Sequence, residues 1–318
     1  MKIEEIAQKT GLSITTVSRF FNHPELLSEK TYKKIAKSTQ ESSDSLIDEG
    51  ATLVGLIVPN LHLSFYAEFV NQLIQQGSKR GYTFIIHISE ESPEEELALI
   101  ENMLSYHIKS LVILSHILSS HQIEEISVPV IAVERKGGNF KQINNDNFAG
   151  GTLVAEHLKQ SGCDVFIHLN DNDDPQIPAF KRLLAFKYAV ENEINEIIIE
   201  KSLSSGDKTL ISNILSPLID KLLETYPTQN IGVFCSNDDL AHSFTVECVK
   251  KQIKIPDVFQ IVGYDNSPIS DKSFLPITSI DQNIQLLATI TLDSIKNHTT
   301  IESIIPAKLL VKSTTFSS

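Results

Sequence analysis

Residues 1–30 read MKIEEIAQKTGLSITTVSRFFNHPELLSEK, and this stretch contains two short helical patterns on either side of a glycine. Ile3, Ile6 and Ala7 have the spacing that forms one apolar stripe of a first helix. Gly11 follows where the chain must turn, because glycine adopts a positive φ at little cost. The spacing therefore predicts a helix, a turn and a second helix that cross closely.

The second helix offers one apolar and one polar face. Ser13 is suited to cap its N-terminus, and its inward-facing residues are Val17, Phe20 and Phe21. The outer face carries Ile14, Thr15, Thr16, Ser18 and Arg19. A helix with small polar residues and one Arg near its start can enter the major groove of DNA. We therefore predict a helix-turn-helix DNA-binding head over residues 1–38, the alternative being a small helical cap on a larger protein.

The length and composition of the chain indicate an ordinary globular protein. Its 318 residues are too many for one hydrophobic core and predict two or three domains. Hydrophobic residues make up 41% of the chain, which is typical of a globular protein. No run approaches the roughly 18 apolar residues of a membrane span, and no apolar segment resembles a secretory signal. We expect a cytoplasmic protein that does not bind membranes.

The net charge of −13 is distributed unevenly along the chain. Residues 1–40 contain seven Lys or Arg and four Glu, a net charge of +3, so the other 278 residues carry −16. A small basic segment on a large acidic body fits a head that reads DNA. Because the acidic body would repel DNA, we expect binding that weakens steeply as the salt concentration rises.

The sequence offers little support for catalysis or for a metal or cofactor site. Cys163, Cys235 and Cys248 are scattered, which favours free buried thiols over disulfides or a zinc site. The AGG at 149–151 lacks the pattern of a phosphate-binding loop, and a nucleophile-elbow GxSxG is absent. We therefore predict a protein that is not an enzyme and has no cofactor and no metal.

After a polar, acidic linker at 39–52, apolar runs alternate with helical patterns. The predicted strands are 53–60, 83–88, 110–115, 128–134, 165–170, 231–238 and 259–266. The predicted helices are 65–81, 92–107, 147–162, 178–192 and 239–252. Continuous apolar strands separated by helices predict α/β lobes with parallel sheets covered on both faces, and their number predicts two lobes. Ligands of such sheets bind beyond the carboxyl ends of the strands.

Eight segments stand in a characteristic order: IEEIAQKTGLSITTVSRFFN, LVGLIVPN, VPVIAVER, NNDNFAGGTLVAEHL, KRLLAF, SNDDLA, IVGYDN and PITSIDQN. Together they resemble the lactose/galactose-repressor (LacI/GalR) family of bacterial transcription regulators over essentially the whole chain. The resemblance implies an all-α helix-turn-helix head and a body over 53–318 like a two-lobed periplasmic sugar-binding protein. It places the first lobe at about 53–160 and 281–302, and the second at about 161–278 and 307–314.

The resemblance also implies which residues contact DNA. Ile14 and Thr15 lie where the family reads base edges, and Arg19 can bind a guanine through two hydrogen bonds. The positions that usually contact phosphate are Ser13, Thr16, Ser18, Asn22, Ser28 and Thr31. Plain helix capping is the alternative role for Thr16 and Ser28.

The linker departs from the family pattern, because it is shorter than usual and lacks a Tyr-x-Pro-Asn turn. Leu46 falls where the family has a leucine that wedges into the minor groove and kinks the DNA. Ile47, Asp48 and Glu49 replace basic or neutral neighbours, and carboxylates there weaken the affinity for phosphates. Leu46 is therefore either a wedge or a linker leucine that packs on the body.

The resemblance places an effector in the cleft between the lobes, with Asp238 and Arg182 in contact with it. Asp238 can accept two sugar hydroxyls or cap the helix that follows it, whereas Asp239 is expected only to cap. Arg182 can bind hydroxyls or carboxylates, or be a solvated helix residue. Further candidates are Arg135, Gln282, which can instead brace a crossover, and Phe65 and Tyr66, which can stack on a sugar or pack in the core.

The predicted function is that of a transcription regulator, more specifically a repressor of carbohydrate-metabolism genes. It would bind a palindromic operator as a homodimer and a sugar or sugar phosphate in the cleft, with the two affinities coupled. Arg182 and Arg135 suit a neutral or a phosphorylated sugar equally. The alternative is a sugar-sensing regulator that binds another protein and has lost DNA binding through its short acidic linker.

Overall fold

The computed structural model describes residues 3–22, 27–28, 30–32, 34–35, 52–90, 92–296 and 302–317. The chain divides into two compact units, Met1–Thr52 and Leu53–Ser318. The linker residues 39–51, including Leu46, lie outside the described residues, as do the side chains of Ile3, Phe21 and Asn22.

The first unit contains α1 (Ile3–Thr10) and α2 (Ile14–Asn22) around a small apolar core. The buried core residues are Ile6, Ala7, Val17 and Ile35. Gly11 has a φ of +63° in the turn. The Ser13 hydroxyl accepts a hydrogen bond from the Thr16 amide at 3.1 Å and so caps α2. The predicted helix, turn and capped second helix are confirmed.

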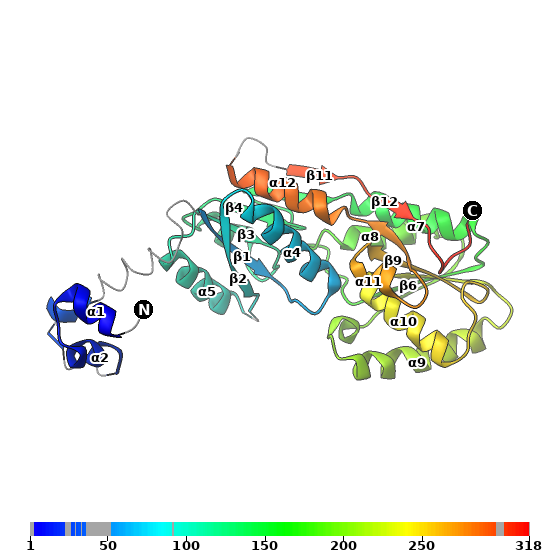
Figure 1. Ribbon diagram of the computed structural model, residues 1–318. Helices are drawn as coiled ribbons and strands as arrows, with labels where there is room; N and C mark the ends of the chain where they lie inside the picture. Colours follow the sequence, from blue (N-terminus) through cyan, green and yellow to red (C-terminus); the bar gives the residue numbers. More distant parts are fainter. Residues whose placement is uncertain are drawn as a thin grey trace. The chain divides into compact units, whose positions relative to one another are not determined.

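The second unit contains two six-stranded sheets (Figure 1). The first sheet has the order β11-β5-β4-β3-β1-β2. Its strands are β1 (Thr52–Val58), β2 (Tyr82–Ile88), β3 (Ser110–Ile113), β4 (Val130–Val133), β5 (Lys141–Asn145) and β11 (Glu302–Ile305). The pairs β1–β3, β3–β4, β4–β5 and β5–β11 are all parallel.

The second sheet has the order β12-β10-β9-β8-β6-β7. Its strands are β6 (Val165–Asn170), β7 (Ile194–Ile199), β8 (Ile231–Cys235), β9 (Phe259–Asp265), β10 (Thr278–Asp281) and β12 (Lys308–Leu310). Its described pairs are parallel except β10–β12, which is antiparallel. The predicted α/β class with two parallel-rich lobes is confirmed.

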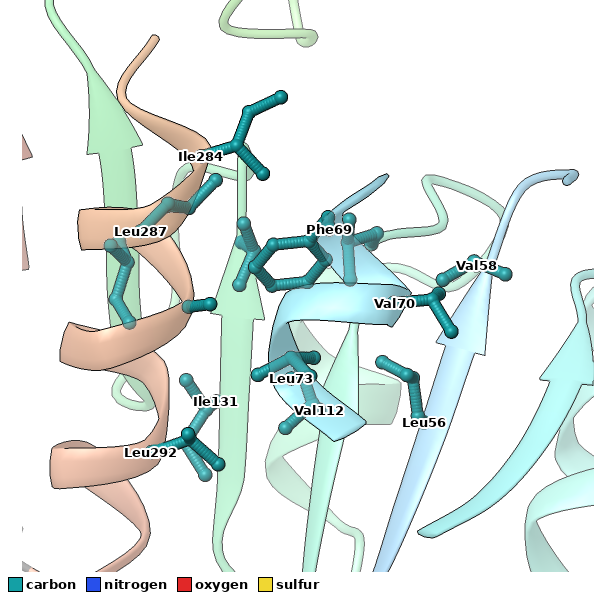
Figure 2. Packing of buried hydrophobic residues seen from close by; sticks show 14 of the residues in the cluster. Leu56, Val58, Phe69, Val70, Leu73, Val112, Ile131, Ile284, Leu287 and Leu292 are labelled. Carbon is teal, nitrogen blue, oxygen red and sulfur yellow. The ribbon is translucent and has the colours of Figure 1, made fainter. Parts of the chain in front are cut away.

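Helices on the first sheet are α4 (Ser64–Ser78), α5 (Pro93–Ser105), the short α6 (Ser120–Glu124) and α12 (Ile284–Lys296). Figure 2 shows how α4 and α12 pack together over the strands. Phe69 and Leu73 of α4 lie against strand residues such as Val112, while Leu287 and Leu292 come from α12. Burying each such side chain contributes roughly 1.5–3 kcal/mol, so this core joins two segments that are distant in sequence.

Helices around the second sheet are α7 (Asn147–Gln160), α8 (Phe180–Ala189), α9 (Lys208–Thr225), α10 (Asp238–Lys250) and the short α11 (Pro268–Lys272). Alternate residues of each strand face opposite cores. Ile167 packs with the α9 and α10 core, whereas its neighbour Phe166 packs with residues of α7 and α8. None of the helices in the described parts of the chain has the length and apolar character needed to cross a membrane.

The expected lobe boundary after residue 160 is wrong for α7. Val154, Ala155 and Leu158 of this helix pack with strands of the second sheet and with Phe186 of α8. The chain therefore leaves the first sheet at the end of β5, before α7 begins. Within the described part of the body it crosses between the sheets three times: from β5 to α7, from β10 to α12, and from β11 to β12.

Gly151 permits the close approach of α7 and α8. A Cβ at this position would lie 2.3 Å from the backbone oxygen of Arg182, a contact that no rotamer change can relieve. We expect Gly151→Ala to lower the free energy of unfolding by about 2 kcal/mol through overpacking. Urea denaturation measures this, with Glu156→Ala, an exposed position on α7, as the control. Equal stability of the two variants would contradict the expected close packing.

Candidate functional site

A cavity of about 590 Å³ lies beyond the carboxyl ends of strands from both sheets of the body. Residues that follow β1, β2, β3 and β4 line one side, among them Leu63, Ser89, His116 and Glu134. Residues at or after β6, β8 and β9 line the other, among them His168, Asp171, Ser236 and Asp265. The volume is within the range of sites that hold small molecules.

Four of the six predicted effector residues line this cavity, namely Phe65, Tyr66, Arg182 and Gln282. Phe65 and Tyr66 lie at the start of α4, where their rings meet edge to face at 5.3 Å between centroids. Phe65 also packs in the core of the first lobe, which is one of the two roles considered for it; its stacking on a sugar stays a prediction. Arg135 and Asp238 are not among the lining residues.

Arg182 is buried on α8, and its guanidinium binds groups from both lobes. Its Nε donates to Asn147 Oδ1 at 2.5 Å and its Nη1 donates to the Ser236 carbonyl at 3.2 Å. Its Nη2 lies 3.9 Å from Glu134 Oε2, and its Cζ lies 3.6 Å above the centre of the Tyr264 ring. The contacts fix the cation at the cavity wall, so Arg182 is not a solvated helix residue.

Glu134 is a site residue that the sequence did not single out. It has a φ of +52° directly after β4, and its Oε1 accepts from the Asn145 amide at 2.5 Å and from Asn145 Nδ2 at 3.0 Å. Its Oε2 accepts from Asn147 Nδ2 at 2.9 Å. The carboxylate therefore orders the first crossover, next to the cavity.

Gln282 joins the second crossover to the same network. Its Oε1 accepts from Asn145 Nδ2 at 2.6 Å, and its Nε2 donates to Asp265 Oδ1. Asp265 lines the cavity, and burial raises its pKa well above the ordinary value. Gln282 thus braces the crossover, one of the two roles considered for it, and it also lines the cavity, while its contact with a ligand stays a prediction.

Asp238 lies behind the cavity wall and is fully buried. Its Oδ2 accepts from the Ser267 amide at 2.7 Å and from the Ser267 hydroxyl at 3.0 Å, and its Oδ1 accepts from the Ser279 hydroxyl at 2.6 Å. Burial raises its pKa to about 7, although these hydrogen bonds oppose the shift. Both carboxylate oxygens are thus used to join α10 to β10 and to the start of α11, and the expected contact with a ligand is not supported by this position.

The expected capping roles at the start of α10 are corrected. The N-cap is Asn237, whose Oδ1 accepts from the Leu240 amide at 2.8 Å. Asp239 instead accepts hydrogen bonds from the Ser64 amide at 2.9 Å and the Ser64 hydroxyl at 2.8 Å. Because Ser64 begins α4 and Asp239 is on α10, this pair connects the two lobes at the edge of the cavity.

Arg135 also serves the framework. Its Nη1 donates to the Ser115 carbonyl at 2.8 Å and its Nη2 donates to the Leu118 carbonyl. These bonds hold the loop after β3, which carries His116 into the cavity. Arg135 therefore supports the lining without being part of it.

On the head, the predicted DNA-contacting residues of α2 differ in how far their side chains are exposed to solvent. Ile14, 54% exposed, Thr15 and Arg19 are exposed, whereas Thr16 and Ser18 are half-buried. Ser13 caps α2, and Ser28 likewise accepts from the Thr31 amide at 3.2 Å. Capping is therefore one established role of Ser28, while the side chain of Asn22 and all of Leu46 lie outside the described residues.

All three cysteines are free and buried, as predicted. Among the described residues there is no group of three or more His, Cys, Asp or Glu side chains that is placed to hold a metal ion.

The two lobes, their three crossovers and the cavity between the strand ends define a ligand-binding body of the periplasmic-binding-protein type, preceded by a helix-turn-helix unit. Residues 155–314 match the model of the periplasmic binding protein-like domain, and residues 2–43 match that of the bacterial regulatory proteins of the lacI family. The chain belongs to this LacI family, which confirms the resemblance inferred from its motifs.

Three similar proteins illustrate the relationship. The chain is 30% identical over 302 residues to the sucrose operon repressor of Streptococcus mutans, covering 92% of this chain and 91% of that protein. The lac repressor dimer bound to operator and the anti-inducer ONPF has a TM-score of 0.70 at 18% identity, and the match covers 100% of this chain and 99% of that one. A LacI family regulator from Enterococcus faecalis V583 with bound ribose has a TM-score of 0.69 at 24% identity, and the match covers 83% of this chain and 98% of that one.

Proposed function

We propose that this protein is a repressor of carbohydrate-metabolism genes that binds operator DNA through α2 and a carbohydrate effector in the cavity. It acts as a homodimer on a palindromic operator, with each head bound to one half-site. The effector changes the geometry of the two lobes, so its affinity and the affinity for DNA are coupled reciprocally.

The observation that carries this proposal is one chain with both a capped α2 that exposes Ile14, Thr15 and Arg19 and a cavity of about 590 Å³ in its body that polar and aromatic side chains line. The cavity combines the aromatic residues Phe65 and Tyr66 with carboxylates, amides and a buried Arg. Sugars are bound by such mixtures, because rings cover their apolar faces and polar groups bind their hydroxyls. The names of the similar proteins, which include repressors of sucrose and ribose operons, agree with a carbohydrate effector.

A DNA-binding titration tests the proposal. The full chain is titrated onto a labelled fragment from upstream of its own gene, and fluorescence anisotropy is measured at several salt concentrations with and without a panel of sugars. We expect saturable binding that weakens as salt rises and that at least one sugar changes at least tenfold. If calorimetry detected sugar binding while this titration showed no operator binding, the result would instead support the alternative of a regulator that acts on another protein.

Arg19 provides the residue-level test of the DNA interface. We expect Arg19→Ala to reduce the preference for operator over unrelated DNA about 5- to 150-fold, because one bidentate contact to guanine contributes about 1–3 kcal/mol of discrimination. The control is Lys34→Ala, which also removes one exposed cation from the head. If Arg19→Ala kept the full preference for operator, α2 would not be the helix that reads the bases.

A further inference from the structure

The cavity has an excess of carboxyl groups over cations. Among the described lining residues, those with carboxyl groups are Glu90, Glu134, Asp171, Asp174 and Asp265, whereas Arg182 is the one permanent cation. The lining histidines add no positive charge near neutral pH, because burial lowers the pKa of both His116 and His168 to about 4. Even without Asp265, four acidic side chains share the described lining with one Arg, so acidic groups predominate in the cavity.

The one cation is also engaged by the protein. Arg182 already donates to Asn147 and to the Ser236 carbonyl, and it lies beside Glu134. A phosphate monoester carries a charge of about −1.5 to −2 at pH 7 and usually requires several donors or cations aimed at its oxygens. Such a group would compete with Glu134 for Arg182 while meeting the other carboxylates.

His168 adds an acceptor at the cavity wall. It is fully buried on β6, and its Nδ1 lies 2.9 Å from the carbonyl oxygen of Phe234. A carbonyl can only accept, so Nδ1 carries the proton and Nε2 of the neutral ring has a free lone pair. Nε2 has no hydrogen-bond partner among the described residues. A buried acceptor without a partner in a cavity wall is suited to receive a hydrogen bond from a ligand hydroxyl.

We propose that the ligand of this cavity is a polyhydroxylated molecule without a phosphate group, whose hydroxyls donate hydrogen bonds to His168 Nε2 and to the cavity carboxylates. This inference rests on the proposed carbohydrate effector and narrows it to unphosphorylated sugars. The Tyr66 hydroxyl, whose pKa burial raises, stays protonated and can donate to a sugar oxygen. The cavity thus selects against phosphate by charge while it binds hydroxyls through acceptors.

Matched pairs of ligands test the selection. Isothermal titration calorimetry on the full chain compares ribose with ribose 5-phosphate, fructose with fructose 6-phosphate, glucose with glucose 6-phosphate, and sucrose with sucrose 6-phosphate. In every pair that binds, we expect the parent sugar to bind at least tenfold more tightly. A phosphorylated member that binds as tightly as its parent would contradict this inference but agree with the proposed carbohydrate effector. If no member of any pair binds, the proposed carbohydrate effector is contradicted as well.

Variants in one loop separate charge from shape. Asp171 and Asp174 line the cavity, whereas Asp173, between them, does not. We expect Asp171→Asn and Asp174→Asn each to raise the affinity for the phosphorylated member of the best-binding pair at least threefold, because each removes one like charge. Asp173→Asn removes the same charge outside the lining and is expected to leave that affinity unchanged. Equal effects of all three substitutions would contradict selection by the cavity lining.

The acceptor role of His168 has its own test. His168→Phe keeps a flat ring but removes Nε2, and we expect it to weaken binding of the parent sugar at least tenfold. Because this variant also loses the hydrogen bond to Phe234, its melting temperature is measured alongside. Nitrogen chemical shifts of the unaltered protein give the tautomer directly. A proton on Nε2 instead of Nδ1 would exclude His168 as an acceptor.

Discussion

Replacing Asp238 with alanine is expected to lower the free energy of unfolding by about 3 kcal/mol. The substitution leaves the Ser267 amide and the hydroxyls of Ser267 and Ser279 without their acceptor in a fully buried place. A buried donor without a partner costs about 1–3 kcal/mol, although the two hydroxyls can turn toward other acceptors. Urea denaturation measures the loss. The control is Asp271→Ala, whose side chain is 72% exposed and whose loss is expected to be within about 0.5 kcal/mol.

Asp238→Asn separates the shape of this residue from its charge. The folded-state pKa of Asp238, about 7, is above its ordinary value of 3.8. The stability that the protonated carboxyl contributes is therefore fully present below about pH 4 and is lost as the pH rises through about 7. An asparagine does not titrate, so the variant should gain stability relative to the unaltered protein between pH 4 and pH 8. A constant difference over this range would mean that Asp238 ionises as it does in water.

Replacing Arg182 with alanine is expected to weaken binding of the effector sugar about 100-fold, or about 2.8 kcal/mol. The change removes the cation that holds Asn147, Ser236 and Glu134 in one arrangement at the cavity wall. Removing one partner of a buried ion pair leaves an uncompensated charge, which is strongly destabilising. The substitution should therefore disturb the local structure of the first crossover and the geometry of the sugar site at the same time.

Calorimetry with the best-binding parent sugar measures the effect, and the melting temperature reports any loss of stability. The control is Lys187→Ala, an exposed cation on the same helix α8, which should bind sugar normally. The sugar affinity of Arg182→Lys should lie between those of the unaltered protein and Arg182→Ala, because an ammonium keeps the charge but cannot reproduce the forked geometry. Normal sugar affinity in Arg182→Ala would exclude this residue from the ligand site.

The fold was predictable where strands are continuous apolar runs. The expected strand at 165–170 matches β6, and the expected helices at 65–81 and 92–107 overlap α4 and α5. The sequence did not indicate β5, KQINN, because polar residues at the start of a crossover hide the strand. It also missed β7, β10 and α9, and it assigned α7 to the wrong lobe, since helical periodicity shows a buried face but not which sheet covers it.

The site was predictable where a side chain follows a strand directly. Gln282 lines the cavity as expected and directly follows β10, whereas Arg182 lies on α8 and was named only through the family resemblance. Glu134 was missed although Arg135 beside it was named, and a positive φ at Glu134 is what turns its carboxylate toward the crossover. His168 lies within the apolar run VFIHLN, where nothing distinguishes a buried histidine with a free acceptor from one with both nitrogens bonded.

The three crossings have a consequence for synthesis on the ribosome. β11 is the last strand of the first sheet to be synthesised and β12 the last of the second, so neither sheet is complete before residues 302–310 have been made. Domains usually fold in order as the chain emerges, the N-terminal one first. Here the head can fold early, but neither lobe can be finished until almost the whole chain has been translated. A prematurely terminated chain would therefore carry a basic head on two open sheets, with exposed edges that favour aggregation.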